Sequence, residues 1–181
     1  MGISFSVKAD VKEVTKALTG LQRKEIPAAV SASLNRAIPT TRTAIIREAS
    51  RYFGVKQKLM RSRIRFQRRD RATKRFWEAG VFSVVSDIPA ALTGKPRQLK
   101  KGATVGRRRY PGKFVATMPS GKTGIYGRLT RKRFPIKEEK IRIHERILPM
   151  IVRNLQTVGM PAFRKRLDHE MRYRLAKRGL A

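Results

Sequence analysis

Apolar residues recur every three or four positions along two long parts of the chain, which is the spacing of a helix with one apolar face. The first part spans residues 26–52, where Pro39 is expected to kink or split the helix and Gly54 to end it. In the last third, Gly159 and Pro161 separate two apolar stripes that lie on different helix faces. The pattern therefore predicts helices near both ends of the chain.

Short stretches with strand character lie before and between these helices. Residues 3–8 alternate apolar and polar side chains, which predicts a strand, and a helix over residues 11–21 follows with Asp10 and Glu13 at capping-box spacing. Four further strands are predicted from "FWEAGVFSVV", "KFVATM", "TGIYGRL" and "PIKEEKIRI", with a bulge expected at Gly80 in the first. Together these elements predict an α+β fold with long N-terminal amphipathic helices, a small, mostly antiparallel sheet with basic loops, and C-terminal helices.

The chain of 181 residues is long enough for one domain with a modest core. We expect a single α+β domain, residues 1–181, built from four consecutive segments. They are an N-terminal strand and helices in 1–55, a basic arm in 56–75, a sheet with basic loops in 76–143 and C-terminal helices in 144–181.

Positive charge dominates the composition, with 44 Lys or Arg against 12 Asp or Glu and a formal net charge of +32. Self-repulsion at this charge disfavours an isolated compact molecule, so a polyanion, an acidic protein surface or an anionic membrane is expected to accompany it. A hydrophobic content of 40% is too high for a disordered basic tail. The lack of cysteine excludes disulfides and cysteine-based zinc sites, and no apolar run is long enough to span a membrane.

The segment "ATMPSGKT" ends in the Gly-Lys-Thr of a phosphate-binding loop, so an ATPase has to be considered. Ala116 occupies the place of the first glycine of that loop, and the "GIYGRL" after Thr123 favours a strand where the loop requires a helix. No acidic residue lies between Asp87 and Glu138 to hold magnesium in a later strand. The segment is therefore predicted to be a hairpin turn rich in proline and glycine.

Other side chains that could catalyse a reaction or bind a metal are few. His169 lies between Asp168 and Glu170, but three adjacent residues of a helix point in different directions rather than towards one ion. The serines lack a nucleophile elbow, and no pair of carboxylates lies in a stretch typical of a cleft. We therefore interpret His169 and the other histidine, His144, as surface residues and predict no catalytic residue, no cofactor, no metal site and no enzyme activity.

Basic side chains are the strongest functional signal in the sequence. Residues 88–137 contain fourteen Lys or Arg and no acid. Arginine suits phosphate oxygens, and no motif reads base sequence, so DNA contact is expected to be non-specific and salt-dependent; docking on acidic protein surfaces is the alternative. The residues expected to contact DNA or an acidic partner are Arg61, Arg63, Arg65, Arg68, Arg69, Arg107, Arg108, Arg109, Lys113, Arg128, Arg131, Lys132 and Arg133.

The order, length and composition of these features resemble the minor tail protein Z family of lambda-like phages and prophages. The resemblance rests on "IPAAVSASLNRAIPTTRTAI", "FGVKQKLMRSRIRF", "RRYPGKFVATM", "GKTGIYGRL" and "RFPIKEEKIRI", in that order, and covers residues 8–178. It implies a structural virion protein at the junction of the tail tube and the head connector, acting late in tail completion near the DNA end. It carries no catalytic residue over to this chain.

The resemblance also implies partners and a location. Relatives in the neck are expected to form a homo-oligomeric ring, hexameric to match the sixfold tail. The neighbouring proteins would be the head-completion (stopper) protein and the tail terminator, with phage genomic DNA as a further partner and no membrane. The protein would be assembled in the cytoplasm of the bacterial host and reside in the neck or tail of the virion.

A stand-alone, non-specific nucleic-acid-binding protein, of the ribosomal or nucleoid kind, is the alternative. It explains the charge equally well. It explains less well the long amphipathic helices with small-residue faces such as "PAAVSAS", which allow another helix to approach closely.

Overall fold

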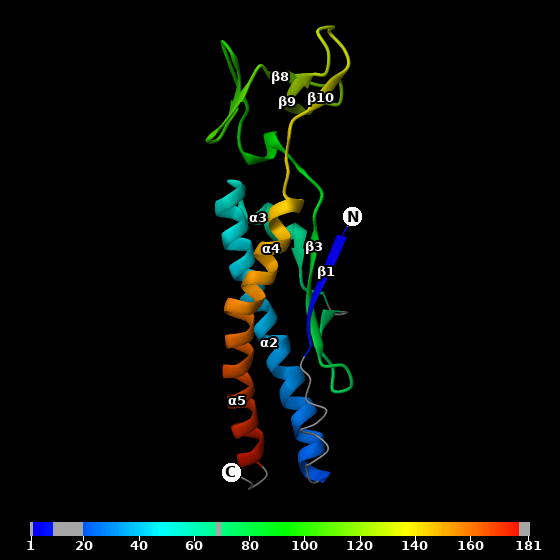
Figure 1. The fold of residues 1–181 in the computed structure, drawn as a ribbon, viewed down its shortest axis with the longest axis vertical. Coiled ribbons are helices and arrows are strands. Elements are labelled where there is room, and N and C mark those ends of the chain that lie inside the picture. The colour runs from blue at the N-terminus through cyan, green and yellow to red at the C-terminus, as the bar shows by residue number, and fades with distance from the viewer. Residues whose placement is uncertain (1, 9–19, 68–69, 178–181) are drawn as a thin grey trace.

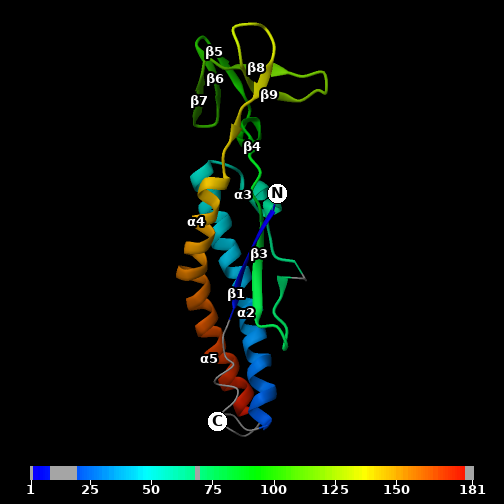
Figure 2. The same ribbon diagram turned by 45° about the vertical axis from the view of Figure 1, so that its right-hand side comes forward.

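The computed structural model describes residues 2–8, 20–67 and 70–177. These residues form an elongated molecule with two parts, a stalk of helices with one sheet beside them and a smaller β-rich part at one end (Figure 1). We call residues 90–140 the head and the other described residues the stalk. Figure 2 shows the same division from a second direction, with the C-terminal end of the last helix at the end of the stalk furthest from the head.

Helix α2 (Gly20–Phe53) runs the length of the stalk. Pro39 was expected to kink or split this helix, and it lies inside α2 without splitting it. Pro39 is exposed, so the backbone hydrogen bond that it cannot make faces water, which can satisfy the free carbonyl. Gly54 ends the helix as predicted, because its φ of +63° suits glycine, and the N–H of Val55 then donates to the carbonyl of Ser50 at 3.1 Å.

The last third forms one continuous helical rod that runs antiparallel to α2 (Figure 1). It consists of α4 (His144–Asn154), a π-helical turn (Leu155–Gly159) and α5 (Met160–Ala176). The wider π turn shifts the helical phase, which explains why the sequence shows two apolar stripes on different faces. A Cβ at Gly159 would lie 3.0 Å from Thr41 Oγ1, so glycine allows the rod and α2 to cross closely. Helix α2 thus meets a helix of its own chain at Thr41.

A three-stranded antiparallel sheet lies along the stalk in the order β1-β3-β2. Its strands are β1 (Gly2–Lys8), β2 (Ile64–Arg65) and β3 (Glu78–Val84), and helix α3 (Gln57–Arg63) leads into β2. The bulge expected at Gly80 is wrong, because β1 and β3 pair residue for residue and Ser6 lies opposite Gly80. The strand predicted over 3–8 is confirmed, whereas Asp10 and Glu13 lie outside the described residues.

Two small antiparallel sheets form the head, in the orders β5-β6-β7 and β10-β9-β8. A separate pair of short strands, β4 with β11, connects the head to the stalk. The elements are β4 (Ile88–Pro89), a 3₁₀ turn (Ala90–Thr93), β5 (Arg97–Leu99), β6 (Gly102–Val105), β7 (Arg108–Pro111), β8 (Phe114–Thr117), β9 (Thr123–Arg128), β10 (Ile136–Glu138) and β11 (Lys140–Ile141).

The predicted α+β class is confirmed, but the single sheet expected over 76–143 is divided between the two parts. Strand β3 packs on α2 and belongs to the stalk, and the strands after it belong to the head. The stalk has a hydrophobic cluster of 24 buried residues among those described. The buried members of the head cluster are only Ala90, Ala103, Val105 and Ile125, with Tyr110 and Val115 packed against them.

Candidate anion-binding surface of the head

The Gly-Lys-Thr segment is a hairpin turn, as predicted. The N–H of Met118 donates to the carbonyl of Lys122 at 3.0 Å, and Gly121, at a φ of +75°, donates back to the carbonyl of Met118 at 2.8 Å. Thr123 begins strand β9, so there is no helix N-terminus at which phosphates would bind. The ammonium of Lys122 lies 2.9 Å from Glu138, and this hydrogen bond raises the pKa of Lys122.

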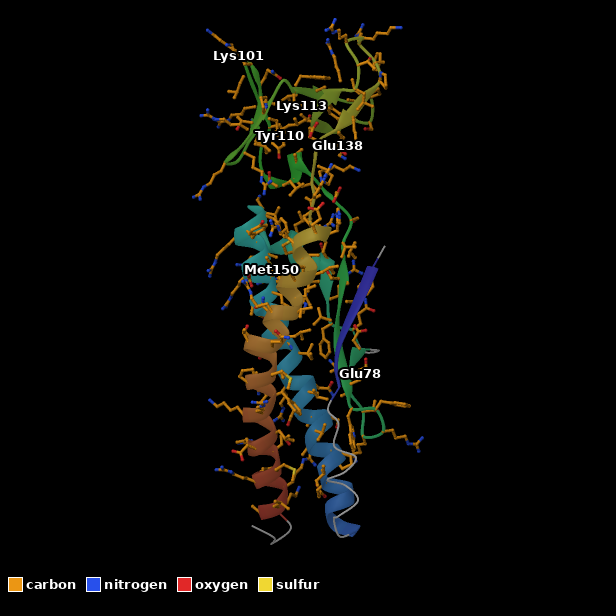
Figure 3. The ribbon with its side chains drawn as sticks, viewed as in Figure 1. Glu78, Lys101, Tyr110, Lys113, Glu138 and Met150 are labelled. Atoms are coloured by element: carbon orange, nitrogen blue, oxygen red, sulfur yellow. The ribbon has the colours of Figure 1, made fainter. Side chains whose placement is uncertain are left out.

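Basic side chains are concentrated on the head. Residues 90–140 contain fifteen Lys or Arg and two acids, Glu138 and Glu139. Both acids are already paired with lysines, since Lys113 Nζ lies 2.7 Å from Glu139 and Lys122 Nζ lies 2.9 Å from Glu138. Figure 3 labels Tyr110, Lys113 and Glu138 in the head, where many nitrogen-tipped side chains project outward. Thirteen basic side chains thus have no carboxylate of the head to balance them.

The head carries eight of the residues predicted from the sequence to contact DNA or an acidic partner. They differ in their exposure and in whether they already have a partner within the chain. Arg107 is exposed in the turn between β6 and β7, and Arg109, Arg131 and Lys132 are exposed as well. Arg128 and Arg133 stack on the rings of Phe114 and Phe134, each 5.8 Å from the ring centroid, which leaves their guanidinium edges open to an anion. The two remaining residues have partners within the chain. Lys113 pairs with Glu139, and Arg108 donates a hydrogen bond to Phe53.

Arg108 connects the head to the stalk. Its Nη2 donates to the carbonyl of Phe53 at 3.3 Å, in the last turn of α2. A cation at a helix C-terminus interacts favourably with the negative end of the helix dipole. Arg108 therefore has a structural contact that the sequence could not show, because 55 positions separate it from Phe53.

The basic arm predicted over 56–75 is instead packed on the stalk where the structure describes it, because α3 and β2 bury apolar residues there. The guanidinium of Arg63 donates to the backbone and the hydroxyl of Ser86, at 2.5 and 3.2 Å, and its burial lowers the pKa of Arg63. Arg65 Nε donates to the carbonyl of Ser62 at 2.6 Å. Arg61 is exposed near the head end of the stalk. Arg68 and Arg69 lie outside the described residues.

Four further basic residues of the head, which the sequence reasoning did not select, are also exposed. They lie in and before the β5–β6 hairpin, which ends at Lys101 (Figure 3), and all four are exposed: Lys95, Arg97, Lys100 and Lys101. The acid-free stretch 88–137 was the signal that contained them. Isolated basic residues in a loop give no indication of which face they occupy until the hairpin register is known.

A cleft of about 400 Å³ lies between the end of α2 and the β6–β7 turn. Three arginines line it, Arg51 from the helix and Arg107 and Arg108 from the head, and no acidic residue does. Guanidinium groups in this number suit phosphate or carboxylate oxygens. The other lining residues are Ser50, Tyr52, Gly54, Thr93, Val105 and Gly106.

Comparison with protein families finds a match to prophage minor tail protein Z over residues 9–178. The chain belongs to this family. The resemblance drawn from the sequence is thereby confirmed, and the chain is a phage tail protein. Comparisons with curated proteins and with solved structures found no match.

For a member of the minor tail protein Z family, a structural role in the virion follows from the family itself. Among the described residues, no group of three His, Cys, Asp or Glu side chains could hold a metal ion. No helix in the described ranges has the length and apolar character needed to cross a membrane. The hydroxyl of Tyr110 in the head is buried and has no hydrogen-bond partner. Burial raises the pKa of Tyr110.

Proposed function

We propose that this tail protein acts at the head–tail junction, where it completes the tail and joins the tail tube to the head connector. In this proposal the chain forms a homo-oligomeric ring, hexameric like the tail, between the stopper and tail terminator proteins. The head faces the end of the phage genome, and the stalks form the body of the ring.

The density of positive charge in the head carries this proposal. Fifteen basic residues and two acids lie in residues 90–140, at one end of an elongated molecule. In the stalk, carboxylates are used to hold helices together, as in the ion pairs of Glu48 with Arg153 and Glu170 with Arg36. The other 130 residues contain 29 Lys or Arg and ten acids, so uncompensated charge is present along the whole chain but is densest in the head, where a polyanion can neutralise it in every subunit of an assembly.

The form of the basic surface suits a DNA passage rather than a sequence reader. Its cations lie on hairpin turns and strands, such as Arg107, Arg109 and Lys101, and none lies on a helix shaped for a major groove. Contacts of this kind go to phosphates and carry no sequence information. Binding is then non-specific and weakens steeply with salt, which allows the genome to slide past.

A charge reversal that spares the internal contacts tests this function. In the test variant, Arg107→Glu is combined with Arg109→Glu, and Arg108 is left intact because it donates to Phe53. The control combines Arg164→Glu with Arg166→Glu, which makes the same charge change on exposed positions of α5. We expect the test variant to weaken duplex binding and to lower the slope of log affinity against log salt by about 2, one unit per lost phosphate contact.

Infectivity of phage carrying each variant gives the second readout. The test variant should abolish DNA ejection or head–tail joining, and the control should leave both intact. Normal infectivity of the Arg107/Arg109 variant would refute the role of the head in DNA passage. The ring is tested separately by the native mass of the nuclease-treated protein, with and without duplex DNA and the neighbouring neck proteins. A subunit that stays monomeric under all these conditions contradicts it.

A further inference from the structure

We infer that the loop of residues 129–135, between β9 and β10, is a protein-docking loop that places Leu129 and Phe134 in an apolar groove of an acidic partner protein. This inference rests on the proposed place of the chain in the virion. The loop lies at the end of the molecule furthest from the stalk in both Figure 1 and Figure 2, so a neighbouring protein can reach it without displacing the stalk.

The loop exposes two large apolar side chains around a basic tripeptide. Leu129 is 62% exposed and Phe134 is 63% exposed. Arg131, Lys132 and Arg133 lie between them, and all three are exposed. Among the described residues, only Phe76 in the stalk is a more exposed large hydrophobic residue than these two. Apolar groups at such a tip are typical of interaction sites rather than of a permanently solvated surface.

Hydrogen bonds within the loop order its backbone. The N–H of Leu129 donates to the carbonyl of Pro135 at 3.1 Å, which closes the base of the loop. The hydroxyl of Thr130 donates to the carbonyl of Phe134 at 3.5 Å and accepts the N–H of Lys132 at 3.3 Å. A loop ordered before it binds loses less conformational entropy on docking.

The small hydrophobic cluster of the head also favours a protein partner. Only four buried residues form that cluster in residues 90–140, which is little for three-stranded sheets to pack upon. At the same time, Leu92, Leu99, Leu129 and Phe134 of the head remain 43–63% exposed. A partner that covers part of this apolar surface would supply the packing that the head lacks.

The chemistry of the loop distinguishes a protein from DNA as the occupant. Phosphate contacts require only the charges of Arg131, Lys132 and Arg133, and they give no role to Leu129 and Phe134. An apolar groove with acidic residues at its rim would satisfy all five side chains at once, because apolar cores with charged rims are the common form of protein interfaces. Insertion of Phe134 between base pairs, as in DNA-kinking proteins, is the competing possibility.

The test uses purified tails and DNA-filled heads assembled in cells that lack the chain. Wild-type chain is added, and the amount that stays with joined particles is measured by quantitative mass spectrometry. The variant Leu129→Ser with Phe134→Ser removes the apolar groups and keeps every charge. The control, Val152→Ser with Tyr173→Ser, changes two residues of the stalk that are 43% and 59% exposed. Duplex affinity and thermal midpoint are measured for each protein.

We expect the loop variant to bind particles about 30-fold more weakly, which is about 2 kcal/mol, with its duplex affinity and thermal midpoint unchanged. The control should bind like the wild type. If the double variant fails to fold, Phe134→Lys alone is used, and it should weaken binding at least tenfold.

Particle binding equal to that of the wild type overturns the inference. Parallel loss of duplex affinity and particle binding also overturns it, and identifies the loop as a DNA contact. If wild-type chain does not join the particles, the proposed function fails and the docking role fails with it. Since the wild type is measured in the same experiment, the two failures are distinguishable.

Discussion

Glu170 of helix α5 is a buried carboxylate, with a side chain 7% exposed, and it lies between two arginines of the stalk. Arg36 of α2 pairs with one of its oxygens, and Arg174 Nε lies 3.3 Å from the other. Arg174 also reaches Glu25 at 3.2 Å, so the four side chains form one network between α2 and α5. The substitution Glu170→Gln keeps the shape of the side chain and removes its charge.

The expected loss of stability follows from the exposure of the partners. A hydrogen bond to a charged group contributes about 1.5–3 kcal/mol. The side chain of Arg36 is 57% exposed, so water replaces part of its lost partner, and Arg174 keeps Glu25. We therefore expect Glu170→Gln to cost about 2 kcal/mol rather than the roughly 3–5 kcal/mol of a fully buried pair. For a chain of this length, about 1 kcal/mol lowers the thermal midpoint by roughly 2–4 °C, so the fall should be about 4–8 °C.

The assay is thermal unfolding of the purified chain, followed by far-UV circular dichroism at low and high salt. Asp168→Asn is the matched control on the same helix, because its pair with Arg172, at 3.0 Å, is 61% and 80% exposed. Such an exposed pair contributes about 0.3–0.5 kcal/mol, so the control should change the midpoint by less than about 2 °C. We set the threshold at about 1 °C, which is about the error of the measurement. If the thermal midpoints of Glu170→Gln and Asp168→Asn differ by less than this, the reasoning is refuted.

Two further predictions concern the head. A Cβ at Gly102, where φ is +143°, would lie 2.4 Å from the carbonyl oxygen of Tyr110, so Gly102→Ala should abolish hydrogen-exchange protection in β5–β7. The control Gly94→Ala should preserve it, because the backbone of Gly94 is extended and its added Cβ would meet no atom nearer than 3.5 Å. Tyr110→Phe removes a buried hydroxyl without a partner and should leave stability unchanged or raise it. Because burial raises the pKa of Tyr110 above 10.0, the stability of the wild type falls as pH rises past that value, and urea titrations should show a smaller fall for Tyr110→Phe.

The long helices of the stalk could be predicted because their apolar residues repeat with helical spacing and lie on the buried face. Ile147, Ile151 and Leu155, for example, are all buried as that spacing requires. The π turn could not be predicted from the same pattern, since one extra residue in a turn looks in the sequence like a helix that stops and restarts. The glycine and proline near that turn suggested a break, yet Pro161 occupies the first turn of α5, where it is tolerated.

The sequence could show which part of the chain forms the basic surface. It could not show which individual residues of that part are free to bind a partner. The acid-free stretch 88–137 identified the part of the chain that carries the charge, and nearly all of it lies in the head. The stretch could not show that Arg108 donates to Phe53 or that Arg63 donates to Ser86, because these partners are distant in sequence. Local charge density reports where a surface is basic, whereas long-range contacts decide which cations are free.

The uneven use of carboxylates links the fold to the proposed function. Glu25, Glu48 and Glu170 each bridge α2 to the antiparallel rod, so three of the eight acids in the described part of the stalk stabilise its helix pairing. The head uses its two acids, Glu138 and Glu139, to hold Lys122 and Lys113 against its second sheet. No carboxylate of the head then remains to offset the other cations. The acids that join the helices lie in the stalk and do not offset the cations of the head, so this surface depends on an anionic neighbour to neutralise it.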